Sequence, residues 1–310
     1  MRALITDPEA PGGLRLGETP DPVPAPDEAL VRVTATSLNH GEASMARQGA
    51  PAGVVLGWDA AGVVVRPADD GSSPPAGTPV VTLGLAGAWA EQRAVNTGMM
   101  GAAPEDADPG AISTIPVAGL SALRALRRLG PVLGRRVLIT GATGGVGRYA
   151  VQLARLAGAH VVASTGDPSA HGDALRSLGA DEVVAGPDDV DVDEPVYGVL
   201  DMVGGHALVA AYDRLAPGGA LVAVGRVTGE GETFPYTMLS GDRGHDRSIV
   251  SFYLPGESGL GPDLTWLAAK VASGVLTPQI SWRGPWAKTA EAMDALLDRR
   301  LHGKAVLDIT

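Results

Sequence analysis

The sequence predicts an α/β fold in which a doubly wound parallel sheet is combined with a small β-barrel. Two observations predict it. Strands alternate with helices over residues 137–254, around a glycine-rich turn at 141–147, and short strands separated by turns fill residues 1–110. Alternation of strands with helices is typical of a parallel sheet with crossover helices. Short strands at close spacing, with little helix between them, are typical of a small barrel.

The N-terminal part is expected to consist of short strands and turns. Strands are predicted at 2–6, 29–37, 61–65 and 80–83. Four prolines make residues 20–27 an extended connection. The stretch 37–42, Ser-Leu-Asn-His-Gly-Glu, is expected to be a polar loop at the end of a strand.

A βαβ unit is predicted at 137–165. A β-branched run at 137–140 indicates a buried strand, an apolar-periodic stretch at 148–157 indicates a helix, and a second strand follows at 160–165. Glycines between strand and helix let a pyrophosphate approach backbone N–H groups at a helix N-terminus, where the dipole favours negative charge. A flexible turn is also glycine-rich, but this position favours a dinucleotide site. The expected cofactor-binding residues of the turn are Gly141, Gly144, Gly145, Val146 and Gly147.

The rest of the chain completes the parallel sheet and then leaves it. Further helices are predicted at 117–128, 169–179, 207–215, 263–274 and 285–301, and further strands at 181–184, 198–203, 219–225, 249–254 and 304–309. The last strand is expected to return to the first domain. The expected boundaries are 1–114 for the first domain, 115–258 for the dinucleotide-binding domain, and 259–310 for the return to the first domain.

Composition excludes several classes of function. With 24 Lys and Arg against 35 Asp and Glu, the formal net charge of −11 argues against nucleic acid or an anionic membrane as partner. No apolar run reaches the ~18 residues of a membrane span, and the first residues carry no apolar signal core, so a cytoplasmic location is expected. The chain has no cysteine, so disulfides, a thiol nucleophile and Cys-ligated zinc are excluded.

Several motifs, taken in order, resemble one family. They are Ser37-Leu38-Asn39, Gly57-Trp58-Asp59-Ala60-Ala61-Gly62, Pro116-Val117-Ala118-Gly119-Leu120-Ser121-Ala122, the glycine turn, Leu178-Gly179-Ala180-Asp181 and Gly303-Lys304-Ala305-Val306-Leu307. Together they resemble the zinc-free quinone oxidoreductase branch of the medium-chain dehydrogenase/reductase superfamily. The resemblance implies a GroES-like β-barrel domain interrupted by a Rossmann domain, with the active site in the cleft between them. It also implies a homodimer joined edge to edge through the Rossmann sheets.

The resemblance further implies chemistry without a metal. Zinc-dependent alcohol dehydrogenases of the superfamily have a Cys ligand at the position of Asn39 and a His ligand at the position of Trp58. Without zinc there is no Lewis acid for alcohol oxidation, so the expected reaction is hydride transfer from NADPH to a quinone or an α,β-unsaturated carbonyl. The alternatives are a pathway-specific enoyl or ketone reductase of secondary metabolism, a non-redox lyase or cyclisation enzyme, and a NADPH-binding structural or regulatory protein.

Catalytic and substrate-pocket candidates come from the first domain. Asn39 is expected either to hold the nicotinamide ribose or the substrate oxygen, or to close a loop on its own backbone. His40 is a candidate proton donor or an outward-facing loop residue, and Glu42 is expected to be structural. Trp58 and Trp89 form either an aromatic substrate wall or part of the barrel core. The family often has a tyrosine just beyond, and this chain has none at 43–47.

Other residues are assigned to the cofactor by position. Ser121 stands where the family has a nicotinamide-contacting threonine, and it is also a possible helix cap. Residues that resemble those lining the nicotinamide half are Val203, Gly204, Gly225, Phe252, Tyr253 and Leu254. At the end of the second strand, Ser164 and Thr165 stand where NAD-binding proteins place an acid, which favours NADPH over NADH. Asp167 would repel a 2′-phosphate if it pointed inward, and Arg148 or Arg176 could compensate.

Overall fold

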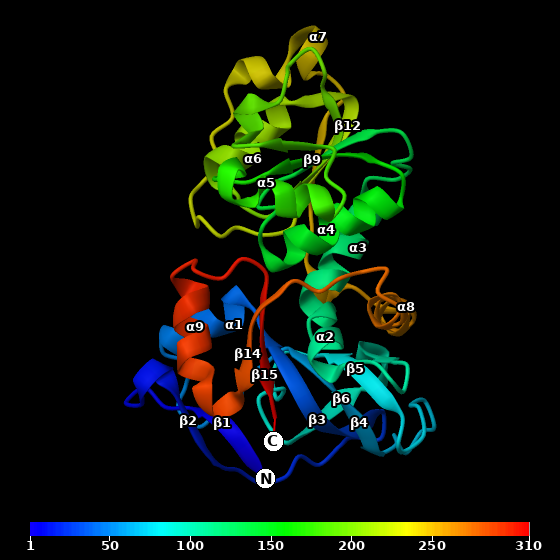
Figure 1. Cartoon of the computed structure of the whole chain (residues 1–310), viewed down its shortest axis with the longest axis vertical. Coiled ribbons are helices and arrows are strands. Elements are labelled where there is room, and N and C mark those ends of the chain that lie inside the picture. Colours follow the sequence, from blue (N-terminus) through cyan, green and yellow to red (C-terminus); the bar gives the residue numbers. More distant parts are fainter. Residues whose placement is uncertain (310) are drawn as a thin grey trace. The chain divides into compact units, whose positions relative to one another are not determined.

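The computed structural model describes residues 1–309, apart from the side chains of Pro11 and Arg243. The chain forms two compact units: unit 1 comprises Met1–Leu120 and the segment from Pro255 onward, and unit 2 comprises Ser121–Leu254 (Figure 1). The chain therefore leaves unit 1, builds unit 2 and returns. The expected return of the last strand is confirmed, because β15 (Lys304–Asp308) pairs antiparallel with β3 (Glu28–Leu38) in unit 1.

Unit 2 contains the predicted parallel sheet. Its strands are β8 (Arg136–Ile139), β9 (His160–Ser164), β10 (Glu182–Val184), β11 (Val196–Asp201), β12 (Leu215–Ala223) and β13 (Ser248–Ser251). They lie in the order β10-β9-β8-β11-β12-β13, and every pairing is parallel. The direction of winding reverses between β8 and β11. In doubly wound sheets, dinucleotides bind outside the carboxyl ends of the strands at such a reversal.

Helices connect these strands. They are α3 (Leu120–Arg128), α4 (Gly145–Leu156), α5 (Pro168–Ser177), α6 (Gly205–Asp213) and the short α7 (Gly241–Gly244). Helix α4 packs against β8 and β9, and α6 packs against β11 and β12. Because helices cover the sheet, its central strands are apolar on both faces: Val137, Leu138 and Ile139 of β8 are all fully buried.

Unit 1 is built on a mostly antiparallel sheet. Its strands are β3 (Glu28–Leu38), β4 (Asp59–Arg66), β5 (Pro79–Leu83), β6 (Gln92–Asn96), β7 (Met100–Ala102), β14 (Ile280–Pro285) and β15 (Lys304–Asp308). The order is β14-β15-β3-β4-β5-β7, with β6 also paired to β3, and only β14 and β15 run parallel. A separate pair is formed by β1 (Arg2–Thr6) and β2 (Leu14–Glu18). The helices of unit 1 are α1 (His40–Arg47), α2 (Pro109–Ile112), α8 (Gly261–Ala272) and α9 (Thr289–Leu297).

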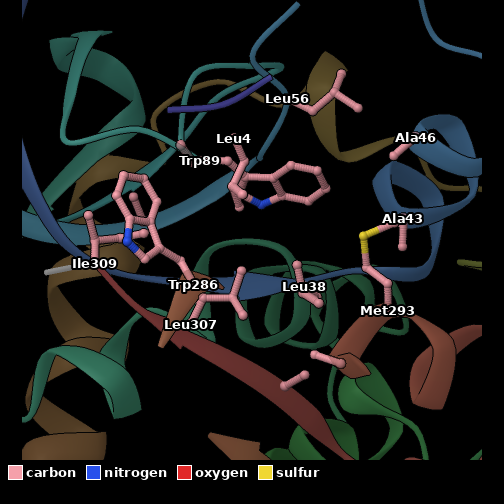
Figure 2. Close-up of a cluster of buried hydrophobic side chains, with 14 of the residues drawn as sticks. Leu4, Leu38, Ala43, Ala46, Leu56, Trp89, Trp286, Met293, Leu307 and Ile309 are labelled. Atoms are coloured by element: carbon pink, nitrogen blue, oxygen red, sulfur yellow. The ribbon is translucent and has the colours of Figure 1, made fainter. Parts of the chain in front are cut away.

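One hydrophobic cluster ties the two chain segments of unit 1 together (Figure 2). Trp89 packs there with Leu4 and Leu56 from the N-terminal segment, and Trp286 and Leu307 come from the C-terminal segment. Helices α1 and α9 lie side by side and contribute small and flexible side chains to the same cluster. The return of the chain is therefore held by core packing as well as by strand pairing.

Three predicted elements are wrong in detail. Residues 37–42 are not a loop, because β3 runs to Leu38 and α1 begins at His40. The helix predicted at 285–301 is shorter, because Pro285 ends β14, Trp286–Lys288 form a 3-10 helix, and α9 runs only from Thr289 to Leu297. The strand predicted at 249–254 ends at Ser251, so residues 252–254 lie beyond it.

Candidate functional site

The glycine turn lies at the carboxyl end of β8, at the reversal of the sheet. Gly144 is the N-cap of α4 and supplies no side-chain acceptor, so the first N–H groups of the helix have no side-chain cap. A Cβ on Gly147 would lie 2.3 Å from the Gly141 carbonyl oxygen and 2.7 Å from the Cα of Ala142. Gly147 therefore lets α4 pack directly on the turn. A Cβ on Gly144 would meet only the Gly141 oxygen, at 3.4 Å, so the space in front of this residue is open.

A side-chain bond ties the two strands that flank the reversal. The Thr140 hydroxyl at the end of β8 donates to Asp201 Oδ1 at the end of β11, at 2.5 Å. Asp201 Oδ2 accepts the backbone N–H of Gly204 at 2.9 Å, which shapes the turn into α6. Asp201 is completely buried, and this burial raises the pKa of its carboxyl group. The pair holds the β8 and β11 ends in register beside the glycine turn.

The end of β9 carries the residues expected to choose the cofactor. Ser164 and Thr165 are buried, and the Ser164 carbonyl accepts the N–H of Ala142 from the glycine turn at 3.0 Å. Asp167 is the N-cap of α5: its Oδ1 accepts the Ala170 N–H at 2.9 Å and the Ser169 hydroxyl at 2.6 Å. These bonds lower the pKa of Asp167, so it is ionised at neutral pH.

The two arginines named as counter-charges lie in different settings. Arg148 is mostly buried in the second turn of α4, and its Nε donates to the Thr143 carbonyl at 3.0 Å. Its pKa is lowered by desolvation. Arg176 is exposed and pairs with Asp173 one turn earlier on α5, at 3.2 Å. Of the two, Arg148 contacts the glycine turn.

The residues assigned to the nicotinamide half follow the carboxyl ends of β11, β12 and β13, except for Ser121, which lies at the start of α3. Gly204 has φ +77°, which favours glycine, and a Cβ on Gly225 would lie 3.0 Å from the Met202 carbonyl oxygen. The backbone carbonyl of Val203 accepts from Thr228. Beyond β13, Phe252 donates its N–H to Ala223 at 3.1 Å. The remaining assigned residues differ in exposure: Tyr253 is exposed, and Leu254 and Ser121 are buried.

Unit 1 contains a cluster of buried charged groups that the sequence reasoning missed. Asp59 is fully buried, and its Oδ2 accepts from Ser37 Oγ at 2.7 Å, Asn39 Nδ2 at 2.9 Å and Lys304 Nζ at 3.2 Å. Its Oδ1 accepts the Val117 backbone N–H at 2.8 Å. The ammonium group of Lys304 also donates to the Leu38 carbonyl at 3.0 Å and to Asn39 Oδ1 at 2.6 Å. This cluster joins β4, β15 and the junction of β3 with α1.

Glu42 and Arg93 extend the cluster. Glu42 Oε1 accepts the backbone N–H of Asn39 at 3.0 Å, and its Oε2 accepts the Trp58 N–H at 2.7 Å. Burial raises the pKa of Glu42 to about 8, the Asp59 carboxylate adds to this rise, and Lys304 opposes it. Arg93 donates to the Trp58 carbonyl at 3.0 Å, and burial lowers its pKa to about 10, so it remains charged. For Asp59, Arg93 and Lys304 the sequence held a signal, because each is a charged residue next to the apolar residues of a strand, whereas Glu42 lies in α1.

The amide of Asn39 is occupied by this cluster. Its Nδ2 donates to Asp59 and, at 3.3 Å, to Glu42 Oε1, and its Oδ1 accepts from Lys304. Both amide hydrogens therefore have acceptors inside the protein. Neighbouring His40 is the first residue of α1, is exposed, and has its Nδ1 3.4 Å from Ser44 Oγ.

The two tryptophans of the expected substrate wall are not equivalent. Trp89 is completely buried in the hydrophobic cluster, which is the core-packing role considered for it. Trp58 is half-buried, and its ring covers the first turn of α1 so closely that a Cβ on Gly41 would lie 2.6 Å from its Cη2. Only Trp58 keeps a partly open face.

Residues 1–309 contain neither a metal-binding group of side chains nor a membrane-spanning helix. No group of three or more His, Cys, Asp or Glu side chains is arranged to hold a metal ion. No helix in the described part of the chain is long and apolar enough to cross a membrane.

Two family models match the chain. The model described as a zinc-binding dehydrogenase matches residues 178–307. The model described as an alcohol dehydrogenase GroES-like domain matches residues 25–112. The first range contains β10 to β14 and most of β15, and the second range contains β3 to β7.

Individual proteins are similar over most or all of the chain. The chloroplastic quinone-oxidoreductase QR1 of Triphysaria versicolor is 37% identical over 201 residues, which are 59% of this chain and 60% of that protein. The putative quinone oxidoreductase YhfP of Bacillus subtilis is 28% identical over 91% of both chains. A mycobacterial protein whose native structure is complexed with NADPH has the same fold, with a TM-score of 0.83 and 23% identity over 99% of this chain and 100% of that chain.

These matches agree with the strand order of unit 2 and with the antiparallel sheet of unit 1. The chain spans about 60% or less of the length of several curated relatives that it matches at 30% identity or more. The two family models together place the chain in the medium-chain dehydrogenase/reductase superfamily, and the proteins to which it is similar include quinone oxidoreductases.

Proposed function

We propose that the protein is a NADPH-dependent reductase that reduces a quinone or an α,β-unsaturated carbonyl without a metal ion. The observation that carries this proposal is the glycine turn between β8 and α4, placed at the reversal of a parallel sheet. The proposal is supported by two relatives, the quinone-oxidoreductase QR1 and the putative quinone oxidoreductase YhfP.

The residues of the turn fit a dinucleotide. The uncapped N–H groups at the start of α4 and the open space in front of Gly144 suit a pyrophosphate, and Gly147 keeps the helix end close to the strand. When bound, NADPH supplies the hydride that the substrate accepts. The protein has to bind it, orient it and keep competing water away.

The end of β9 supports NADPH over NADH. Ser164 and Thr165 place hydroxyl groups where an acid would select NADH. The nearby acid, Asp167, is held as the cap of α5 by two hydrogen bonds, so its carboxylate is directed to the helix end. Arg148 brings a positive charge to the glycine turn. NADH remains a weaker alternative in this scheme.

The residues at the expected zinc position do not fit a zinc ion. An indole ring such as that of Trp58 offers no lone pair to a metal, and the amide of Asn39 is bonded to Lys304 and Asp59. The substrate must then be polarised already, as the β-carbon of an enone or a quinone is. The proton that follows the hydride would come from His40 or from water.

The test is absorbance-followed oxidation of NADPH and NADH, each offered with a panel of quinones and enones, after cofactor binding has been measured by fluorescence. Consumption of NADPH with a member of the panel supports the proposal. Tight binding without consumption would favour the alternative of a regulatory NADPH-binding protein. Binding of neither nucleotide would overturn the assignment of the glycine turn.

A homodimer is part of the proposal. β13 is the edge strand of the parallel sheet, and Ile249 within it is 45% exposed. An exposed edge strand with unpaired backbone groups favours pairing with a second strand. Pairing of two copies through β13 would extend the sheet across the dimer.

A further inference from the structure

The segment that follows β12 lies across the carboxyl end of β11. We call residues 226–232 the strap. The strap is mostly exposed, but Glu232 within it retains only 17% of its side-chain surface. Past the strap, Phe234 packs edge-on against Tyr212 of α6, with ring centroids 5.5 Å apart. The strap is therefore fixed at both ends, by β12 and by Phe234, and spans the start of α6 between them.

The strap forms hydrogen bonds with backbone groups at the end of β11 and the start of α6. Val203 O accepts two bonds from Thr228, one from the hydroxyl at 3.2 Å and one from the backbone N–H at 3.3 Å. Gly205, the first residue of α6, donates its N–H to Glu232 Oε1 at 3.1 Å. The Val203 carbonyl and the Gly205 N–H therefore both have their hydrogen-bond partners within the chain.

Internal bonds hold the strap in this position. Arg226 Nη2 donates to Glu232 Oε2 at 2.8 Å and to the Glu230 carbonyl at 3.0 Å. The Thr228 hydroxyl also accepts the Glu230 N–H at 3.3 Å. The fit is close: a Cβ on Gly205 would lie 2.9 Å from Glu230 Oε2 and 3.1 Å from Thr228 Oγ1. The strap therefore adopts a built closed form that covers the β11 end.

This position matters because of what is expected to bind beside it. The β11 end adjoins the reversal of the sheet, to which Thr140 and Asp201 tie it. A ligand that starts at the glycine turn and runs along the carboxyl ends of the strands reaches residues 203–205 next. There it would meet the Glu232 carboxylate at the N-terminus of α6, where a helix otherwise attracts anions and acceptors.

We propose that the strap is a gate: Thr228 and Glu232 occupy the β11 end in the free protein, and the far half of NADPH displaces them when it binds. The inference rests on the proposed function, since it needs a dinucleotide at the glycine turn. The adenosine half can bind with the strap closed, whereas the nicotinamide half requires it open. Closure then lowers the affinity for the whole dinucleotide and leaves the affinity for its adenosine fragment unchanged.

The chain contains no cysteine, so two introduced cysteines can pair only with each other, and their disulfide can lock the strap. The double variant Gly205→Cys with Glu230→Cys joins α6 to the strap, where an ideal Cβ on Gly205 lies 3.1 Å from the Glu230 Cβ. This separation is a few tenths of an ångström below the usual disulfide range of about 3.5–4.5 Å, and the exposed strap can shift by that amount. Gly205 has φ +58°, so a cysteine there is strained, and this strain is present in the oxidised and the reduced variant alike. The reduced form of the same variant is the reference. The probes are NADPH and adenosine 2′,5′-bisphosphate, each titrated by calorimetry.

The expected result is that oxidation weakens NADPH binding at least about tenfold and leaves bisphosphate binding unchanged. Equal NADPH affinity in the oxidised and reduced forms would overturn the gate while leaving the proposed function intact. If the wild-type protein bound neither probe, the dinucleotide site itself would be refuted, and the gate with it.

A second variant opens the strap without a new covalent bond. Glu232→Gln keeps an acceptor for the Gly205 N–H and removes the ion pair with Arg226. Stopped-flow NADPH fluorescence should show association roughly three- to tenfold faster, because the closed form is less populated. The matched control is Glu230→Gln, which removes the same charge from the same strap but leaves the backbone carbonyl that Arg226 contacts. Unchanged or slower association in Glu232→Gln, or equal acceleration in both variants, would contradict the gate.

Discussion

Replacing Gly147 by alanine tests the geometry of the glycine turn. The new Cβ would lie 2.3 Å from the Gly141 carbonyl oxygen and 2.9 Å from the carbonyl carbon of Ala142. Both are backbone atoms, which cannot rotate away as a side chain can. Overpacking of this kind costs about 1–3 kcal/mol, and we expect the upper end of that range. The gain of ~1 kcal/mol from alanine inside a helix offsets only part of it.

The expected net effect is a loss of roughly 2 kcal/mol in the free energy of unfolding of unit 2. The loss should be local to β8 and α4, and it should be accompanied by weaker NADPH binding because the helix N-terminus moves. Peptide-resolved hydrogen exchange measures the first effect, and fluorescence titration with NADPH measures the second. The control is Gly186→Ala, whose Cβ would come no closer than 4.0 Å to another residue's backbone.

Gly144→Ala separates folding from binding. Its Cβ would make only an ordinary contact of 3.4 Å with the Gly141 oxygen, so stability should change by less than about 0.5 kcal/mol. The methyl group would, however, stand in the space proposed for the pyrophosphate, and NADPH affinity should fall. Wild-type affinity in this variant would refute the close-approach argument. Wild-type exchange rates in Gly147→Ala would refute the packing argument.

Three further predictions concern unit 1 and the dimer. Burial raises the pKa of Glu42 to about 8, so the protonated acid stabilises the fold below pH 4.5 and this stability is lost as the pH rises through 8. Between pH 6 and 8 the free energy of unfolding should therefore fall by about 2 kcal/mol. Glu42→Gln should flatten this dependence of the unfolding free energy on pH. Parallel profiles would contradict this. Lys304→Met leaves Asp59 buried without its cation and should lower the free energy of unfolding by about 3–5 kcal/mol. The control Lys288→Met, at an exposed position, should lower it by almost nothing. Equal stability of the two variants would be inconsistent with the cluster. Ile249→Lys should convert a dimer to a monomer in sedimentation, and an unchanged mass would argue against pairing through β13.

Aromatic residues offer separate probes for these measurements. All five tryptophans lie in unit 1, and all five tyrosines lie in unit 2. Unfolding followed by tryptophan fluorescence therefore reports on unit 1 alone. This matters because a chain of two units need not unfold in one step, and a single unfolding free energy would then have no defined meaning. The Glu42 and Lys304 predictions are best measured with this probe.

Unit 2 was predictable because its signals are local. The strand at 137–140, the glycine turn and the following helix are contiguous in the sequence, and each has its own periodicity. Parallel strands with right-handed crossovers leave few arrangements, so local patterns determine most of the sheet. One error occurs where pairing with a distant strand decides the structure. Residues 37 and 38, expected in a loop, belong to β3 because they pair with Val306 and Ala305 of β15.

The buried charges of unit 1 were not predictable in the same way. Lys304 and Asp59 are 245 positions apart, and neither has a local partner that reveals its role. The Gly303-Lys304 pair was recognised only as a matching motif. Glu42 was assigned a structural part from its position, but the three residues that share its charge environment, Asp59, Lys304 and Arg93, come from three different strands. A single sequence does not show which strands become neighbours.

The occupied amide of Asn39 changes where the chemistry has to come from. Asn39 donates its amide hydrogens to Glu42 and Asp59, and its amide oxygen accepts from Lys304. The side chain therefore holds the cluster together and has no free donor for a substrate. Polarisation of the substrate by this side chain would require one of three internal bonds to break, at the cost of leaving a buried charged group short of a partner. In the proposed reaction, the substrate would therefore have to be electrophilic before it binds. An unactivated ketone, which needs a strong donor or a Lewis acid at its oxygen, should accordingly be a poor substrate compared with a quinone.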